Sequence, residues 1–272
     1  MQIFDWLLIF GGILLLVFCV YLFLIAPGRS LGVKKYKGAK FAHRGLHNAE
    51  RAENSMSAFR AATEAGYGIE LDVRLSKDGE LVVFHDDTLD RVCGVEGKVI
   101  DFTADELGEI KLSGTEDGVP RFSDVLTLVS GRVPLLVEIK EDAGNSAVST
   151  KCAEMLSKYD GEFIVESFNP LSLKNAKKTL QKVPHGILSH RYYEYEKYRK
   201  PLYFLLQTLL LNCTCRPSFV AYDHRHSDAF SLRILKKLFG VTTFAWTVRS
   251  PEEEKKAIEN GFDGIIFENY NP

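Results

Sequence analysis

Short apolar runs alternate with amphipathic stretches along most of this 272-residue chain, and this alternation limits the possible folds more than any other feature. The strand-like runs are nine in number: residues 39–43, 68–75, 80–85, 134–140, 162–167, 185–188, 218–222, 241–247 and 263–267. The helical stretches between them include residues 55–65, 146–158, 171–180, 227–238 and 251–260. Apolar strands that alternate with helices predict parallel βα units. An eight-stranded barrel has one strand fewer, so one run should be a hairpin arm or an accessory strand.

Residues 40–272 contain no Pro/Gly/Ser-rich linker, charge run or fixed-period repeat that would divide them. A stretch of roughly 230 residues is the size of one α/β barrel or of two small domains. Because no linker is visible, we predict one domain, a (β/α)8 barrel, over residues 40–272.

The N-terminal segment differs from the rest of the chain. Residues 6–26 contain no charged side chain and are mostly Leu, Ile, Val and Phe. As a helix this run would be about 31 Å long, which is enough to cross the hydrocarbon core of a bilayer. A cleaved signal peptide is the alternative, but no basic residue precedes the run and the run is too long. We therefore predict a transmembrane anchor over residues 1–28 and a basic juxtamembrane linker over residues 29–39.

The charges that flank the apolar run predict its orientation. No Lys or Arg precedes the run, and the cations that follow it are Arg29, Lys34, Lys35, Lys37 and Lys40. The positive-inside rule places the side that follows the span in the cytoplasm. We expect a single-pass protein of the cell membrane with a cytoplasmic C-terminal domain and the lipid bilayer as a partner.

Charged residues are nearly balanced, with 34 Lys+Arg against 36 Asp+Glu and a net charge of −2. A nucleic-acid binder would normally show a basic stripe, so no nucleic-acid partner is expected. The five cysteines are scattered, and Cys213 and Cys215 form only a CxC without a second pair at zinc-ligand spacing. We expect no disulfide framework, as is usual in a reducing compartment, and no protein partner can be inferred.

Chemically active side chains and one tryptophan stand late in one predicted strand after another, or directly after it. They are His43, Arg44, Glu70, Asp72, His85, Glu138, Lys140, Ser167 and Trp246. A parallel barrel places its active site at the carboxyl ends of its strands. Burying carboxylates and histidines at the ends of apolar strands costs free energy, so packing alone does not explain why they occur there.

The carboxylates predict a metal site. Glu70 and Asp72 are two positions apart, so their side chains lie on one face of a strand and repel each other unless a cation or a proton lies between them. Glu138, on another strand, supplies a third oxygen ligand. Such a donor set suits one divalent cation, Ca²⁺ or Mg²⁺, and does not suit zinc. The alternative is a set of exposed carboxylates in surface salt bridges.

The histidines and cations predict phosphodiester chemistry. His43 and His85 follow separate strands and could act as general base and general acid near neutral pH. A lone histidine is more often a structural residue. Arg44 and Lys140 add positive charge that would neutralise a phosphodiester. No GxSxG or Cys/His signature supports a side-chain nucleophile.

Several motifs resemble the glycerophosphodiester phosphodiesterase family. HRG, ENS, ELD and HDDTLDR follow one another within residues 42–107, and later motifs are EIK at 138–140, SFNP at 167–170, AWTV at 245–248 and GFDGII at 261–266. The resemblance implies a TIM-type (β/α)8 barrel after one N-terminal transmembrane helix. It further implies that His43 and His85 are the acid/base pair and that Glu70, Asp72 and Glu138 bind the metal. Arg44, Lys140, Ser167 and Trp246 would contact the substrate, while Glu53 and Asn54 would organise the loop.

The sequence departs from the family pattern in two places. A Thr-Asp/Asn-x-Pro type of stretch usually follows GII, whereas this chain has Phe267, Glu268, Asn269 and Tyr270, a change expected to touch no catalytic residue. The second departure is an apolar and aromatic insertion over residues 191–217. It is either a buried barrel helix or an interfacial segment that opens the cleft toward the membrane.

The resemblance implies a hydrolase that cleaves glycerophosphodiesters to glycerol 3-phosphate and an alcohol. A lysophospholipase D-like cleavage of lysophospholipids to lysophosphatidic acid is the enzymatic alternative. A glycosidase would also need paired carboxylates, but it leaves the histidines and cations unexplained. A membrane-tethered binding module on an inactive barrel would require a broken motif, and each expected position holds the expected residue type.

Overall fold

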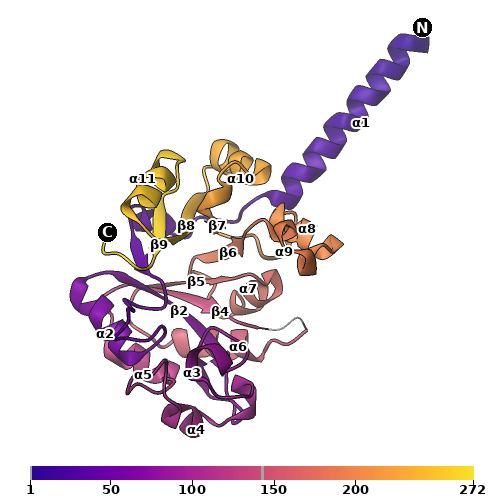
Figure 1. The fold of residues 1–272 in the computed structure, drawn as a ribbon. Helices are drawn as coiled ribbons and strands as arrows, with labels where there is room; N and C mark the ends of the chain where they lie inside the picture. Colours follow the sequence, from indigo (N-terminus) through magenta and orange to yellow (C-terminus); the bar gives the residue numbers. More distant parts are fainter. Residues whose placement is uncertain (1, 142–143) are drawn as a thin grey trace.

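The computed structural model describes residues 2–141 and 144–272 (Figure 1). Its strands are β1 (Lys40–Ala42), β2 (Gly68–Leu75), β3 (Leu81–Val83), β4 (Leu135–Ile139), β5 (Phe163–Ser167), β6 (His185–Ser189), β7 (Phe219–Asp223), β8 (Thr242–Val248) and β9 (Gly264–Phe267). All of them except β3 pair in parallel, in the order β1-β9-β8-β7-β6-β5-β4-β2, and β1 pairs with β2 to close the ring. The predicted TIM-type barrel is confirmed.

The surplus strand is β3. It pairs antiparallel with the outer end of β2, with Leu81 opposite Leu75 and Val83 opposite Val73. β2 therefore extends beyond the barrel, and the hairpin brings the chain back to the level of Asp72, where the Phe84 backbone N–H donates to the Asp72 carbonyl at 2.9 Å. The run 80–85 is thus the hairpin arm.

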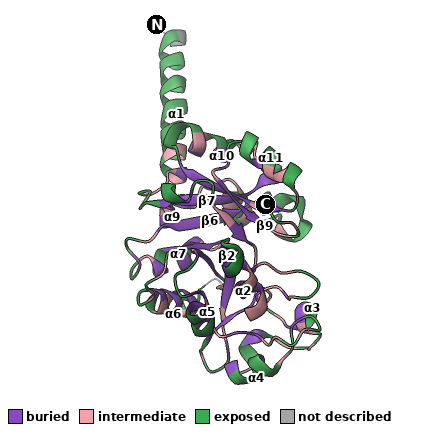
Figure 2. Ribbon diagram, turned by 90° about the vertical axis from the view of Figure 1, so that its left-hand side faces the viewer, coloured by how far each residue is buried: buried purple, intermediate pink, exposed green. Residues whose placement is uncertain are grey.

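The helices are α1 (Gln2–Ile25), α2 (Met56–Ala65), α3 (Asp90–Cys93), α4 (Ala104–Glu109), α5 (Phe122–Val129), α6 (Ala147–Leu156), α7 (Pro170–Ala176), α8 (Pro201–Gln207), α9 (Asn212–Cys215), α10 (Phe230–Ile234) and α11 (Pro251–Glu259). Figure 2 shows buried strands enclosed by helices with exposed outer faces. The main core lies between strands and helices, where Leu71, Val137 and Val220 face outward from the barrel. α3 and α4 belong to a separate small lobe with its own core around Phe84, Leu89 and Leu107.

The barrel interior has an apolar floor below a charged upper layer. The floor is built from Phe41, Leu136, Ile164, Phe219 and Phe244. Gly186 makes room for one of these rings, because a Cβ atom there would lie 1.9 Å from the ring of Phe219. Since side chains alternate along a strand, the residues two positions beyond Leu136 and Ile164 also point inward, at the upper layer.

Part of the predicted juxtamembrane linker belongs to the barrel. Residues Val33–Tyr36 form a short 3₁₀ helix, and the side chains of Val33 and Tyr36 are buried against the interior cluster that contains Phe41 and Phe219. The barrel domain therefore begins before residue 40. The basic side chains of Lys34 and Lys35 are exposed on the outer face of this 3₁₀ helix.

α1 projects away from the barrel with its N-terminus far from the other helices (Figure 1). Within the described part of the chain, it is the one helix long and apolar enough to cross a membrane. Large apolar side chains are exposed along it from Phe4 to Phe23, whereas Ile25 is fully buried at its foot. The foot is fixed by the insertion, because Asn212 Nδ2 donates to the Ile25 carbonyl at 2.9 Å.

Candidate active site

The three predicted metal-binding carboxylates converge inside the barrel. Glu70 and Asp72 point inward from β2, and Glu138 of β4 is directly in register with Asp72. All three side chains are buried, and each offers an oxygen atom within 4.8 Å of those of the other two. This arrangement can hold a metal ion, and hard cations with oxygen ligands suit it best.

Burial makes this cluster electrostatically unstable without a cation. Burial raises the pKa of Glu70 well above its usual value and raises the pKa of Glu138 to about 7. Burial alone would also raise the pKa of Asp72, but the positive charges of Lys140, His85 and Arg44 lower it. Asp72 Oδ1 is buried without a hydrogen bond, although Lys140 Nζ lies 3.1 Å away. Three close carboxylates with an unbonded oxygen fit a divalent ion.

The two predicted cations lie at the same layer. Lys140 Nζ is 2.7 Å from Glu138 Oε1, and Arg44 Nε is 3.6 Å from Asp72 Oδ2. The Arg44 backbone has a positive φ of 56°, which directs its N–H to Glu70 Oε2 at 2.9 Å. Gly45 follows with a φ of 80°, and a Cβ atom there would lie 2.9 Å from Ala58. The HRG turn therefore needs glycine at this position.

The ENS motif supports this turn, as predicted. Glu53 accepts hydrogen bonds from Arg44 Nη1 at 2.7 Å and from both Nη atoms of Arg91 at 2.7–2.8 Å. Asn54 is buried, and its Nδ2 donates to Asp72 Oδ2 at 2.8 Å. Glu53 thus orients a cationic side chain, while Asn54 orients one of the three clustered carboxylates.

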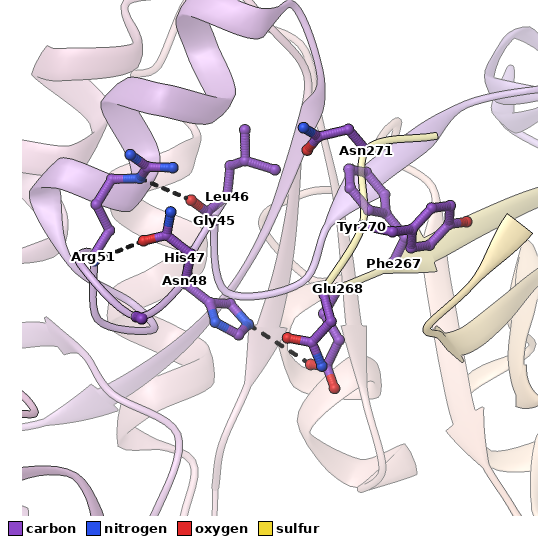
Figure 3. Close-up of a pocket in the computed structure, with 11 residues that line it drawn as sticks. Gly45, Leu46, His47, Asn48, Arg51, Phe267, Glu268, Tyr270 and Asn271 are labelled. Atoms are coloured by element: carbon purple, nitrogen blue, oxygen red, sulfur yellow. Dashed lines mark hydrogen bonds and ion pairs between the residues drawn. The ribbon is translucent and has the colours of Figure 1, made fainter.

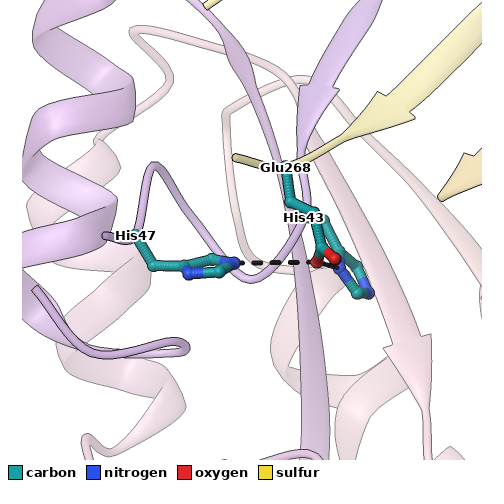
Figure 4. A group of neighbouring side chains, drawn as sticks. All are labelled: His43, His47 and Glu268. Atoms are coloured by element: carbon teal, nitrogen blue, oxygen red, sulfur yellow. Dashed lines mark hydrogen bonds and ion pairs between the residues drawn. The ribbon is translucent and has the colours of Figure 1, made fainter. Parts of the chain in front are cut away.

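His43 follows β1 and is oriented by a residue that sequence reasoning missed. Its Nδ1 lies 2.5 Å from Glu268 Oε2, at the end of β9 (Figure 4). An ionised carboxylate can only accept, so Nδ1 carries the proton and Nε2 keeps its lone pair. The expectation that the departure after GII touches no catalytic residue is therefore wrong.

Two further groups hold Glu268. Arg249 Nε donates to Glu268 Oε1 at 2.7 Å, and His47 Nε2 lies 3.7 Å from Oε2. Although burial would raise the pKa of Glu268, the hydrogen bond from His43 and the nearby ring of His47 lower it well below its usual range. Burial lowers the pKa of His43, which keeps its ring neutral at pH 7. Figure 3 shows His47 and Glu268 beside a cavity of about 370 Å³.

The β2–β3 hairpin delivers His85. Its Nδ1 lies 2.6 Å from Asp86 Oδ1, and the other Asp86 oxygen accepts from Arg91 Nε at 2.6 Å. Burial lowers the pKa of His85 to about 4. The charge of Asp72 raises the pKa of both His43 and His85, so both rings lie near that carboxylate.

Ser167 ends β5, and Trp246 lies late in β8. The Ser167 hydroxyl donates to the Ile139 carbonyl at 2.7 Å and accepts from the Asn169 N–H at 3.1 Å, so it holds the loop after β5. The Trp246 ring packs edge-on against Phe168 at 5.6 Å. Their contact with substrate stays a prediction.

Glu166 is a buried acid that the sequence analysis did not single out. It is in register with Glu138 across β4 and β5, and its Oε2 is buried without a hydrogen bond. Burial raises its pKa well above the usual range, and the nearby charges of Glu70 and Glu138 add to this. Residues 164 and 166 are two positions apart on one strand, so both point to the inner face. This alternation would have been sufficient to find Glu166 from the sequence.

A cleft of about 750 Å³ opens from the carboxylate cluster, with Glu138 and Lys140 in its wall. Its other residues come from the ends of β2, β4, β5 and β6, from the segments that follow β5 and β6, and from the insertion, and they include Phe168, Tyr192 and Leu206. The volume lies within the ~300–1,000 Å³ range of small-molecule sites.

Comparisons with known proteins agree with this site. The model of the glycerophosphoryl diester phosphodiesterase family matches residues 43–271. A glycerophosphodiester phosphodiesterase of Caldanaerobacter subterraneus subsp. tengcongensis is 32% identical over 249 residues, covering 83% of this chain and 91% of the relative.

More distant relatives and solved structures agree as well. A lysophospholipase D of Rattus norvegicus is 23% identical over 269 residues, covering 86% of this chain and 84% of the relative. The crystal structure of a glycerophosphodiester phosphodiesterase from Thermotoga maritima superposes with a TM-score of 0.65 at 29% identity, covering 85% of this chain and 94% of that one. Sequence motifs, barrel and acidic cluster thus agree, and the chain belongs to the glycerophosphodiester phosphodiesterase family of enzymes.

Proposed function

We propose that this protein hydrolyses glycerophosphodiesters to glycerol 3-phosphate and an alcohol, with one divalent cation held by Glu70, Asp72 and Glu138. The observation that carries the proposal is the convergence of three buried carboxylates beside two cationic side chains and two histidines. That combination suits a phosphodiester. The anionic substrate needs positive charge beside it, and its cleavage needs proton transfer from the attacking oxygen and to the leaving oxygen.

Ca²⁺ or Mg²⁺ is the expected ion, because every donor is a carboxylate oxygen. When bound, the ion would neutralise phosphate oxygens and the charge that develops on them. Arg44 and Lys140 supply further positive charge for the phosphodiester at the rim of the cluster. Trp246 and Ser167 are the further side chains that we expect to contact the substrate.

The two histidines transfer the protons. His43 Nε2 removes the proton from the free glycerol hydroxyl, whose oxygen then forms a bond to phosphorus. The negative charge of the bound phosphodiester raises the pKa of His85 from its low value in the free site, so this ring carries a proton. The bond from phosphorus to the alcohol oxygen breaks, and His85 donates its proton to that oxygen. The product is a cyclic phosphate, and water opens it with the two histidines in reversed roles. Glu268 and Asp86 orient the rings through Nδ1.

A second candidate is lysophospholipase D-like cleavage, which yields lysophosphatidic acid. The same chemistry applies, because a lysophospholipid also carries a free glycerol hydroxyl beside its phosphodiester. The apolar walls of the cleft favour this candidate.

The exposed apolar surface of α1 supports the role of an uncleaved membrane anchor. We assign the barrel to the cytoplasmic side, because Arg29, Lys34 and Lys35 follow the span. Protease treatment of right-side-out and inverted membrane vesicles tests the orientation: the barrel should be digested only in inverted vesicles. A mature protein that begins after residue 26 would instead identify a signal sequence.

Product analysis tests the reaction. The full-length protein is incubated with a mixed panel of glycerophosphodiesters and lysophospholipids, with Ca²⁺ or Mg²⁺ supplied, and the products are identified by mass spectrometry. Glycerol 3-phosphate or lysophosphatidic acid should appear together with the free alcohol. Binding of the diesters without turnover would contradict the proposal.

A further inference from the structure

The cleft beside the carboxylate cluster has a charged part and an apolar part. Glu138 and Lys140 line it where it meets the cluster. Much of the rest of its wall is apolar and aromatic, and the residues that form this part are Phe168, Tyr192, Leu202, Tyr203, Leu206 and Leu211. A water-soluble glycerophosphodiester has no group that would fill such a wall. We call this part of the cleft the apolar groove.

The insertion between β6 and β7 builds most of the apolar groove. Its helix α8 has no buried residue, whereas Leu209 just after it is buried in the main core. The apolar run is therefore only partly the buried barrel helix that one reading of the sequence predicted. Hydrogen bonds hold α8 to the barrel, because Ser189 Oγ donates to the Leu206 carbonyl at 3.0 Å and Tyr222 Oη donates to the Gln207 carbonyl at 3.1 Å. The groove is therefore part of the folded structure.

The same insertion is attached to the foot of α1. Arg216 Nη1 donates to the Phe23 carbonyl at 2.7 Å, and the Gly28 N–H donates to the Pro217 carbonyl at 2.8 Å. These contacts lie just ahead of β7, whereas Tyr21 Oη donates at 2.8 Å to Ser231 Oγ, beyond the carboxyl end of β7. The C-terminal end of α1 therefore contacts the barrel from the segment before β7 to the segment beyond its carboxyl end, the side on which the active site opens.

Exposed apolar side chains occur on that side of the barrel. Leu171, Leu202, Phe204 and Phe230 are 45–67% exposed, and they lie in segments that follow the carboxyl ends of β5, β6 and β7. Figure 1 shows α8 and α9 close to the foot of α1. A groove that opens beside a membrane helix and an apolar rim is suited to a ligand that comes from the bilayer.

We propose that the apolar groove binds the single acyl chain of a lysophospholipid that enters from the membrane, with its phosphodiester beside Glu138 and Lys140. This inference rests on the proposed function, because the lipid must have a free glycerol hydroxyl to attack its own phosphate. A diacyl phospholipid has no such hydroxyl, so one chain is the appropriate occupant. The head-group alcohol leaves with the proton that His85 donates, and water completes the hydrolysis to lysophosphatidic acid.

Two substrates with the same leaving group test the role of the chain. Glycerophosphocholine and a 1-acyl lysophosphatidylcholine both release choline, so one choline assay measures kcat/KM for each with the full-length protein in phospholipid nanodiscs. The lysolipid should be preferred at least 100-fold. For short-chain lysolipids that are monomeric in water, lengthening the chain should raise kcat/KM roughly fourfold for each methylene that the groove buries, until the groove is full.

Substitutions in the apolar groove test whether the preference for the lysolipid arises there. Leu206→Trp should reduce the ratio of the two kcat/KM values at least tenfold, because the indole fills the space of the chain. Leu206→Ala should move the preferred chain length upward. Leu238 is 60% exposed in the segment after α10 and outside the groove, so Leu238→Trp is the matched control and should leave both values unchanged.

A photoactivatable lysophosphatidylcholine with a diazirine at the end of its chain gives a readout that does not require turnover. Cross-links should map to residues 192–214, and Leu206→Trp should remove them. Equal kcat/KM values for the two substrates, or cross-links confined to α1, would overturn the inference while choline release from glycerophosphocholine leaves the proposed function intact. If neither substrate is cleaved with Ca²⁺ or Mg²⁺ present, the proposed function fails first and the inference with it.

Discussion

The carboxylate of Glu268 accepts a 2.5 Å hydrogen bond from Nδ1 of His43, although 225 positions separate the two residues in the sequence. They meet because β9 pairs with β1 when the barrel closes, and each residue directly follows its strand. The bond fixes the tautomer of His43 and supports its positive charge after it has accepted a proton.

Replacing Glu268 should change both the rate and the pH dependence. Burial lowers the pKa of His43, and the carboxylate of Glu268 opposes this effect. Glu268→Gln removes the opposing charge, so the pKa of His43 should fall further and the acid limb of the kcat/KM profile should move to lower pH. We expect kcat to fall on the order of 10²-fold, because the base is weaker and less well oriented.

Tyr270→Phe is the matched control for this substitution. Tyr270 lies on the same C-terminal segment as Glu268, and the substitution removes only the 3.1 Å hydrogen bond from Tyr270 Oη to Glu254. Its pH profile should match that of the wild type. An unshifted acid limb in Glu268→Gln would show that Glu268 does not act through His43.

Removing His85 should affect poor leaving groups most. His85→Ala should reduce turnover of a choline diester by about 10²–10⁴-fold, because no acid protonates the departing oxygen. A p-nitrophenyl diester needs no such proton and should lose much less. The measurement is the ratio of kcat values for the two substrates, and near-normal turnover of the choline diester would disprove the acid assignment.

Cation binding should weaken as the pH falls. Burial raises the pKa of Glu138 to about 7 and that of Glu70 well above its usual value, so the metal-free cluster holds protons at neutral pH. A bound divalent cation must displace them, and its affinity should rise about tenfold per pH unit for each proton displaced. Titration calorimetry in two buffers of different ionisation enthalpy counts the released protons. Equal affinity at pH 6 and pH 8 would contradict this account.

Glu166 should lower the stability of the metal-free protein at high pH. Burial raises the pKa of Glu166 in the folded protein above its value in the unfolded chain. The stability that the protonated acid contributes is therefore fully present below the unfolded pKa and is lost as the pH rises through the folded pKa. Glu166→Gln needs no proton and should raise Tm by a few degrees at pH 8 in EDTA, since 1 kcal/mol corresponds to about 2–4 °C in a domain of this size.

This gain should shrink toward pH 5, where the native acid is protonated. The exposed Glu109 supplies the control, because Glu109→Gln removes the same charge at the surface. A Tm difference for Glu166→Gln that does not vary with pH would show that the acid is ionised in the folded protein.

Periodicity was sufficient to predict the parallel strands and the convergence of Glu70, Asp72 and Glu138, because both follow from local alternation. It could not identify β3 as the hairpin arm, since an antiparallel arm and a barrel strand have the same apolar pattern. Glu268 was missed for a different reason: its partner is set by closure of the barrel, which brings together the two ends of the sequence. Val33 and Tyr36 were assigned to a linker because the neighbouring lysines dominate that segment.

The most direct test of the account is the dependence of hydrolysis on the ion bound by Glu70, Asp72 and Glu138. Glycerophosphocholine turnover is measured after exhaustive chelation and during titration with Ca²⁺ or Mg²⁺, for the wild type and for Asp72→Asn. We predict that the metal-free wild type is inactive, that one equivalent of ion restores it, and that the ion does not restore Asp72→Asn. Full activity of the metal-free wild type, or identical restoration of Asp72→Asn, would contradict the account.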